Sequence, residues 1–227
     1  MKKATKILAV VMAMVLCVCI GVGATLAWLT DRTGDVVNTF APTKLIDPTP
    51  DPKYPGKDGF DIYEHASKTN ADGSNELQME KPLVQENTYP RVLPDVDLNK
   101  DPFVHIKAQE DAYVYVEIVD TLPGTMTWKI DNNNWTKMEG VTGPYGGSVY
   151  KYTGTIQGVV GYITPGMGAQ DINILLNKVV EVAPTFEPDT LKVGETDTLT
   201  FYAYAAQHAG QDSAEAAWTS ANFQKIA

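Results

Sequence analysis

The sequence predicts an all-β fold, a jelly-roll-like two-sheet β-sandwich with one short C-terminal helix. Beyond residue 28, short runs rich in Val, Ile, Thr and Tyr alternate with Gly, Pro, Asn and Asp, the pattern of strands joined by turns. About eight such strands in about 200 residues are typical of a two-sheet sandwich. With 227 residues, of which 44 % are apolar, the chain forms one or at most two domains.

The N-terminus has the organisation of a secretory signal peptide. Lys2, Lys3 and Lys6 precede an apolar run over 7–22, and small residues follow up to Ala27. We therefore expect cleavage between Ala27 and Trp28. A retained membrane helix is the alternative, because 7–29 is long enough to span about 30 Å of hydrocarbon. In either case the charge distribution leaves the rest of the chain outside the cell.

Eight segments carry the strand pattern. In order they are 36–46, 103–108, 112–119, 127–130, 135–138, 148–153, 171–182 and 198–206. The clearest is 112–119, in which Val114, Val116 and Ile118 alternate with polar or aromatic residues and define one buried face. The same alternation in 103–108 predicts that His105 points outward.

Three departures from simple alternation carry further predictions. The Asx-rich 131–134 stretch predicts a hairpin between the strands on either side of it. Segment 171–182 breaks strict alternation, which indicates a bulge or a fully buried strand. Near the end, Asp212 as cap and Glu215 three residues later predict a helix over 212–223.

The prolines at 48, 50, 52 and 55 disfavour a strand, so we predict that residues 47–75 form a Pro-rich surface insertion. This divides the chain into a signal peptide (1–27), an N-terminal strand segment (28–46), the insertion (47–75) and the remainder of a single sandwich domain (76–227). Both cysteines, Cys17 and Cys19, lie in the signal peptide, so the mature product contains none.

Charge and motif content argue against several classes of function. The formal net charge of −10 becomes −13 when residues 1–27 leave with their three lysines, which disfavours nucleic acid as a partner. The three histidines, His65, His105 and His208, form no zinc-binding motif. We therefore predict that the chain has no catalytic residue and no cofactor, and that it is not an enzyme. A secreted metallo-hydrolase is the least favoured alternative.

One cluster has the spacing of cation ligands. Asp95, Asp97, Asn99 and Asp101 place oxygen side chains at alternate positions, as calcium loops do. Lys100 stands where the EF-hand turn has glycine, and Ile106 where it has glutamate. Turn capping without an ion is the alternative interpretation.

Several blocks together resemble a known family. Ala24-Thr-Leu-Ala-Trp-Leu-Thr-Asp31 at the cleavage junction, followed by Val37-Asn-Thr-Phe40, resembles the camelysin/TasA-type exported proteins of Gram-positive bacteria, and is closest to clostridial biofilm matrix proteins. Further similar blocks are Val92–Asp95 (with Asp95 where the family usually has glycine), Lys100–Val104, Asp111–Val116, Thr164–Gly166, Tyr202–Gln207 and Ala216–Trp218.

The resemblance implies a secreted jelly-roll subunit that assembles into extracellular biofilm fibres. It implies that a dedicated signal peptidase acts during export, that the membrane is a partner only before cleavage, and that other copies and other matrix proteins are later partners. In related fibres an N-terminal strand completes the sheet of the next subunit. We expect 28–40 to be this donor, with Trp28, Leu29, Val37 and Phe40 as apolar anchors. The family's metalloprotease annotation has no supporting motif here, and a monomeric adhesin-like surface module is the main alternative.

Overall fold

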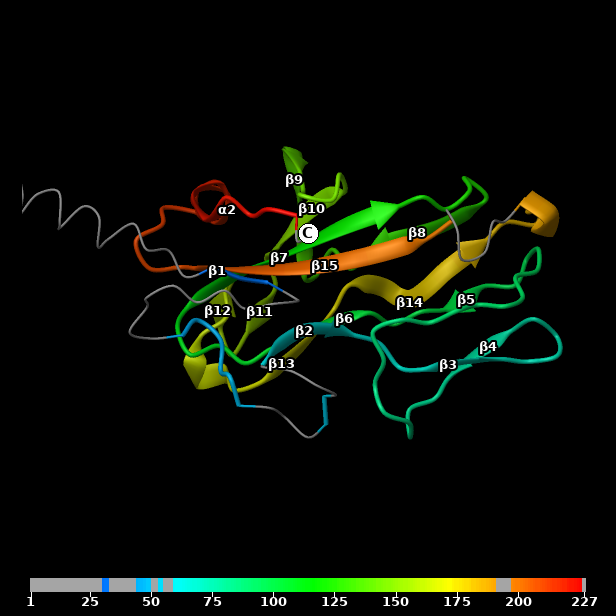
Figure 1. Ribbon diagram of the computed structural model, residues 1–227, viewed down its shortest axis with the longest axis horizontal. Helices are drawn as coiled ribbons and strands as arrows, with labels where there is room; N and C mark the ends of the chain where they lie inside the picture. The colour runs from blue at the N-terminus through cyan, green and yellow to red at the C-terminus, as the bar shows by residue number, and fades with distance from the viewer. Residues whose placement is uncertain (1–29, 33–43, 50–52, 55–58, 191–196, 226–227) are drawn as a thin grey trace, which may run out of the picture.

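The computed structural model describes residues 30–32, 44–49, 53–54, 59–190 and 197–225. It confirms an all-β, sandwich-like fold with one short C-terminal helix in the described residues (Figure 1). None of the helices in these ranges has the length and hydrophobicity needed to cross a membrane. Residues Ala27, Trp28, Leu29, Val37 and Phe40 lie outside the described ranges, as do both cysteines.

The first layer is a five-stranded antiparallel sheet with strand order β1-β15-β7-β10-β9. Its strands are β1 (Thr30–Arg32), β15 (Leu199–Gln207), β7 (Ala112–Asp120), β10 (Ser148–Tyr152) and β9 (Trp135–Thr142). Strands β7 and β15 pair along their whole length, which places two of the most apolar segments of the chain at the centre of the sheet.

The second layer consists of two three-stranded sheets, ordered β13-β6-β2 and β5-β14-β8. Its strands are β2 (Phe60–Tyr63), β5 (Leu98–Asn99), β6 (Phe103–Ile106), β8 (Met126–Ile130), β13 (Gln170–Asn173) and β14 (Leu175–Val182). Only Ile174 separates β13 from β14, so the two sheets are consecutive along the chain. The positive φ angles of Asn177 and Lys178, both 57°, form the irregularity predicted for this segment.

The remaining elements are short. They are the hairpins β3 (Ser67–Thr69) with β4 (Asn75–Leu77) and β11 (Thr155–Ile156) with β12 (Val159–Val160), the 3₁₀ turns at Pro165–Met167 and Pro188–Thr190, and helix α2 (Ala214–Ala221). The helix confirms the prediction over 212–223, but its cap is Ser213 rather than Asp212. Ser213 Oγ accepts a hydrogen bond from the amide of Ala216 at 3.2 Å.

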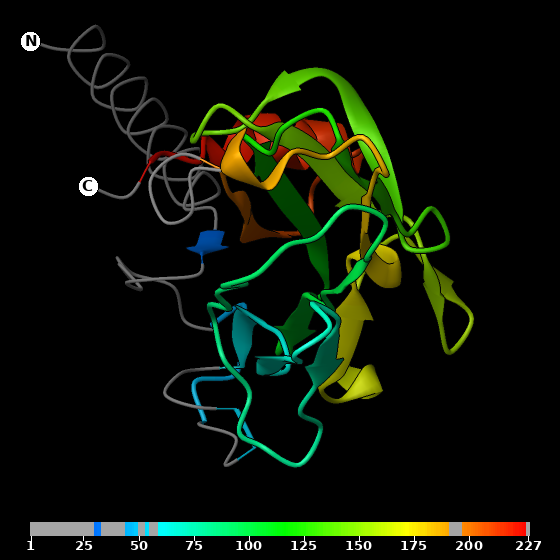
Figure 2. The ribbon, with the colours of Figure 1, turned by 90° about the vertical axis from the view of Figure 1, so that its right-hand side faces the viewer.

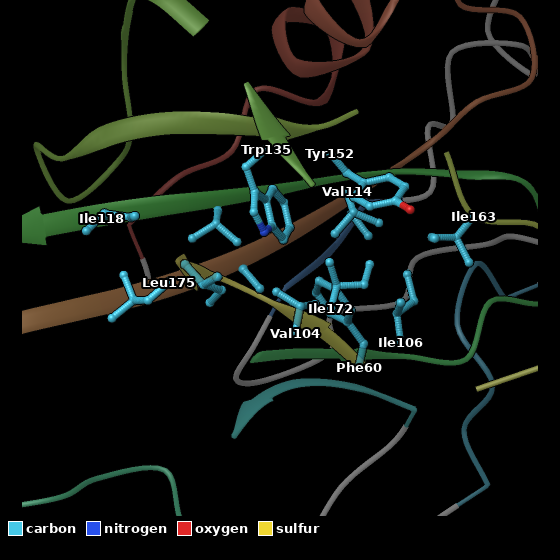
Figure 3. Packing of buried hydrophobic residues seen from close by; sticks show 14 of the residues in the cluster. Phe60, Val104, Ile106, Val114, Ile118, Trp135, Tyr152, Ile163, Ile172 and Leu175 are labelled. Atoms are coloured by element: carbon cyan, nitrogen blue, oxygen red, sulfur yellow. The ribbon is translucent and has the colours of Figure 1, made fainter. Parts of the chain in front are cut away.

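The main core fills the space between the layers (Figure 3). Val114, Val116 and Ile118 are buried there, which confirms the face predicted from their alternation. They pack in one cluster with apolar side chains of the second layer, among them Val104 and Ile172. Burying such a side chain stabilises the fold by about 1.5–3 kcal/mol.

A second core covers the other face of the first layer. Helix α2 brings Trp218 and the following Phe223 against Tyr115 and Tyr204, with ring centroids 4.9–6.2 Å apart. In Figure 2, α2 (red) and β2 (cyan) lie on opposite sides of the molecule. The first layer is therefore covered on both faces, and the charged residue in the middle of β7, Glu117, is buried completely.

The hairpin predicted around 131–134 is wrong. The turn is present, with the Asp131 carbonyl accepting hydrogen bonds from the amides of Asn134 and Trp135. However, β8 pairs with β14 in the second layer and β9 pairs with β10 in the first. An Asx-rich turn therefore moves the chain from one layer to the other.

Two surface predictions are also wrong. Residues 47–75 are not simply a surface insertion, because Phe60 and Tyr63 are buried and β2 pairs with β6. His105 does not face solvent: only 1 % of the residue is exposed, and the ring of Tyr54 stacks on it at a centroid distance of 3.6 Å. The Pro-rich segment supplies Tyr54, which covers the outer face of β6. Of the strand predicted over 36–46, the described part contains buried Leu45 and Ile46 and a single bridge to Ala108.

Candidate functional site

In the part of the chain that the structure describes, strand β15 is paired along only part of its outer edge. Strand β1 pairs with Ala206, Ala205 and Tyr204. On the other side of β15, the Thr198 carbonyl accepts a hydrogen bond from the Thr121 amide. Backbone groups alternate in direction along an antiparallel strand, so Leu199, Phe201 and Ala203 direct their amides and carbonyls away from β7. Among the described residues, no strand pairs with this stretch.

A cavity of about 610 Å³ lies beside the unpaired stretch, at the seam between the two layers. Its walls come from several separate segments: 197–202 at the start of β15, strand β2 with Glu64, the 85–92 loop, parts of β5, β8 and β14, and the turn that carries Tyr145. The apolar and aromatic part of its lining comprises Ile62, Tyr63, Tyr89, Val92, Leu98, Leu122, Met126, Tyr145, Val180, Leu199, Phe201 and Tyr202. A seam of this volume and composition can accept an extended segment with apolar side chains.

A buried ion pair lies in the wall of the seam cavity. Lys100 Nζ donates to Glu64 Oε2 at 2.9 Å, and only 11 % and 6 % of the two side chains are exposed. The rings of Tyr89 and Phe201 each lie 5.7 Å from the Lys100 ammonium. Burial, together with the nearby Glu64 and Asp101 carboxylates, raises the pKa of Tyr89 far above its usual value. The phenol of Tyr89 therefore remains neutral at physiological pH.

Asp101 organises the junction between β2 and β6. Its Oδ1 accepts a hydrogen bond from the His65 amide at 3.0 Å, and its Oδ2 lies 2.7 Å from His65 Nδ1. Lys178 Nζ approaches the same carboxylate to 3.9 Å. The residue is 1 % exposed, so these contacts hold the end of β2, and with it the seam, in place.

The calcium candidate is not assembled. Asp97 Oδ1 accepts a hydrogen bond from the Val182 amide, and Asp101 is bound to His65. Asn99 makes reciprocal hydrogen bonds with Asn75 through backbone and side-chain groups. Asp95 occupies a turn with φ 59°. Within the described part of the chain, no three His, Cys, Asp or Glu side chains form a group that could hold a metal ion.

A second polar cluster lies on the outer face of β6. Asp171 accepts hydrogen bonds from the Tyr54 hydroxyl at 2.5 Å and from His105 Nδ1 at 2.8 Å, with Lys53 at 3.5 Å. Burial opposes ionisation of Asp171, but the hydrogen bonds from His105 and Tyr54 outweigh it and lower the pKa of the carboxyl. This cluster ties the Pro-rich segment to the sandwich.

Glu117 joins three parts of the first layer from its central strand. Its Oε1 accepts hydrogen bonds from the amides of Tyr145 and Gly147, both at 2.8 Å. Its Oε2 accepts the hydroxyl hydrogen of Tyr204 at 2.7 Å. Sequence reasoning missed Glu117, although a carboxylate in the middle of a strand of aliphatic and aromatic residues is a signal for a buried polar anchor.

Together, the sandwich, the edge of β15 with no described partner beyond residues 204–206, and the adjacent seam cavity form the candidate site. A scan against protein-family models and searches of curated proteins and of solved structures each return no match. The predicted anchors and the cleavage junction lie outside the described residues. The edge of β15 and the seam cavity are therefore the part of the candidate site that the structure describes.

Proposed function

We propose that this chain is an exported structural subunit that polymerises into extracellular fibres of a biofilm matrix by donating its N-terminal strand to the next copy. The observation that carries the proposal is that, among the described residues, the outer edge of β15 is paired only at 204–206 and lies beside a 610 Å³ seam cavity. Leu199, Phe201 and Ala203 direct backbone hydrogen-bonding groups toward that side. A donor strand would pair with these groups and place its alternate side chains in the cavity.

The pairing of β1 with its own subunit supports an exchange of this kind. In the described part of the chain it covers three residues, Thr30 to Arg32. Each backbone hydrogen bond contributes about 0.5–1.5 kcal/mol net, so the pairing of these three residues stabilises the subunit only slightly. A longer strand from a neighbour would extend the ladder toward Leu199 and bury apolar surface in the seam, which makes exchange between copies favourable.

Head-to-tail strand donation would also let a filament grow without closing into a ring. The donor lies at the N-terminus and the acceptor on β15, so the two contacting surfaces are different. A heterologous contact of this type produces an open filament unless its rotation happens to close a ring. The resemblance of the cleavage junction and later blocks to camelysin/TasA-type proteins supports export and a matrix role for the filament.

Electron microscopy of the mature chain, beginning at Trp28, tests this proposal. Fibres are expected from the mature chain, and deletion of 28–38 should leave soluble monomers that retain the β-sheet circular dichroism spectrum. Normal fibres from the deleted chain would refute strand donation. A mature chain that stays monomeric under all conditions but binds matrix polymer would instead indicate the adhesin-like alternative.

A further inference from the structure

We propose that Tyr145 and Tyr202 form an intramolecular dityrosine cross-link when a peroxidase and hydrogen peroxide act on the folded chain. Their ring centroids are 3.8 Å apart and their planes differ by 2°. Both side chains line the mouth of the seam cavity, and both residues are partly exposed. A small oxidant or a peroxidase-generated radical can therefore reach them without unfolding.

The two rings are positioned by the same buried carboxylate. Tyr202 lies directly opposite Glu117 in the β15–β7 register. The Tyr145 amide donates to Glu117 Oε1, and the Gly147 amide donates to the same oxygen. Glu117 thus fixes the turn that carries Tyr145 above the strand that carries Tyr202.

The stacking geometry itself indicates that the surroundings impose it. Isolated aromatic pairs prefer offset or edge-to-face arrangements to a face-to-face stack. Here the small interplanar angle and the short centroid distance bring the ring carbons of two tyrosines into contact. Such a fixed arrangement removes the entropic cost of bringing two reacting groups together.

The chemistry balances with hydrogen peroxide as the oxidant. Each tyrosine loses one electron and its phenolic proton, giving two phenoxyl radicals with spin density at the carbons ortho to oxygen. A bond forms between one ortho carbon of each ring, both carbons release their protons as the rings regain aromaticity, and the two oxygens are reprotonated. The two electrons and two protons lost overall reduce one hydrogen peroxide to two waters.

The bond would join strand β15 to the turn between β9 and β10. It would fix the mouth of the seam cavity covalently in a mature chain that contains no cysteine for a disulfide. The ring pair Tyr113 and Tyr162 serves as an internal comparison, because its centroids are 6.4 Å apart and its planes meet at 71°. We expect no cross-link there. The proposal is independent of whether the chain forms fibres.

Oxidation of the dilute mature chain with a peroxidase and peroxide, followed by peptide mass spectrometry of the monomer band, tests the inference. We expect dityrosine fluorescence in that band and a joined peptide pair containing Tyr145 and Tyr202, lighter than the sum of the two peptides by two hydrogens. Tyr145→Phe and Tyr202→Phe should each lose both signals, whereas Tyr113→Phe should keep them. Thermal unfolding followed by circular dichroism verifies that the variants are folded.

Two results would overturn the cross-link. One is a monomer band without dityrosine although the peroxide has been consumed. The other is monomer fluorescence that persists in Tyr145→Phe or maps to a different tyrosine pair. Dimers joined through other tyrosines, with no 145–202 peptide, would likewise count against it.

Discussion

The Glu117 carboxylate accepts the Tyr204 hydroxyl hydrogen at 2.7 Å, between adjacent strands and beneath helix α2. None of the Glu117 surface is exposed, and its other oxygen accepts two backbone amides. A buried carboxylate is tolerated only when such donors replace water. This one residue therefore connects the central strand, the 143–147 turn and the packing of the helix.

Replacement of Glu117 should distinguish hydrogen bonding from simple volume. Glu117→Ala leaves two amides and one hydroxyl without an acceptor, and we expect a loss of about 3–5 kcal/mol in the free energy of unfolding. Glu117→Gln keeps an acceptor for the amides and should lose about half as much or less. Urea denaturation measures both. Glu139→Gln on the exposed part of β9 is the control and should stay within about 0.5 kcal/mol of the wild type. Equal losses for Ala and Gln would contradict the hydrogen-bonding role.

The Glu64–Lys100 pair should behave as a coupled unit. Removal of one partner leaves the other charge buried, so Lys100→Met or Glu64→Gln alone should each destabilise the fold by about 3–5 kcal/mol. The double variant should lose clearly less than the sum of the two. The Lys129–Glu181 pair has a similar distance, 3.0 Å, but its side chains are 64 % and 45 % exposed. Its coupling in the same double-mutant cycle should be at most about 1 kcal/mol. If the coupling energy of the Glu64–Lys100 pair were no larger than that of the Lys129–Glu181 pair, the result would show that water reaches the wall of the seam cavity.

The central strands of the first layer could be predicted from the sequence, because burial on one face imposes alternation. Val114, Val116 and Ile118 follow this pattern, and they are buried as expected. The position of His105 could not be predicted in this way. Its alternation is that of an exposed residue, but the ring of the distant Tyr54, from a segment with an unfavourable proline pattern, stacks on it.

The candidate site was harder to predict from the sequence, because it is formed by contacts between segments that are distant along the chain. An Asx turn such as 131–134 has the same composition whether it closes a hairpin or crosses between layers. The seam cavity likewise combines Glu64, Tyr89, Lys100 and Phe201 from separate stretches, none of which forms a motif. The resemblance to a known family predicts that the N-terminal segment is a donor strand, whereas the proposed acceptor edge could be located only from the strand order.

Asp171 should make the free energy of unfolding depend on pH in the acidic range where this carboxyl titrates. Its pKa in the folded state is lower than the usual value of 3.8, because the hydrogen bonds from His105 and Tyr54 outweigh burial. A group with a lowered folded pKa contributes stability that is fully present above the unfolded value. The contribution is lost as the pH falls below 3.8 and through the folded pKa. Urea midpoints measured from neutral to acidic pH should therefore fall less steeply below this range in Asp171→Asn than in the wild type. Asp189→Asn, on an exposed turn, controls for loss of a charge. Parallel pH profiles for the wild type and Asp171→Asn would contradict the assignment.

A proline in the unpaired edge should block the acceptor without disrupting the subunit. The backbone of Phe201 points away from β7, so Phe201→Pro removes no hydrogen bond of the β15–β7 ladder, and proline is tolerated at such edge positions. It does remove an amide that a donor strand would use, and its ring obstructs pairing. We expect Phe201→Pro to abolish fibre growth, and the matched Phe201→Ala, which loses the ring but keeps the amide, to retain it. Circular dichroism should show both variants folded.

Mixing two defective chains gives the sharpest test of a directional contact. A chain lacking 28–38 keeps its acceptor but has no donor, and Phe201→Pro keeps its donor but has a blocked acceptor. Each alone should remain monomeric. Their mixture should stop at a one-to-one dimer in analytical ultracentrifugation, because the single compatible contact leaves no further donor and acceptor free to pair. Either chain, added in small amounts to wild-type subunits, should shorten the fibres by capping opposite ends. Long fibres from the mixture of the two variants, or no association at all between them, would show that β15 is not the acceptor edge.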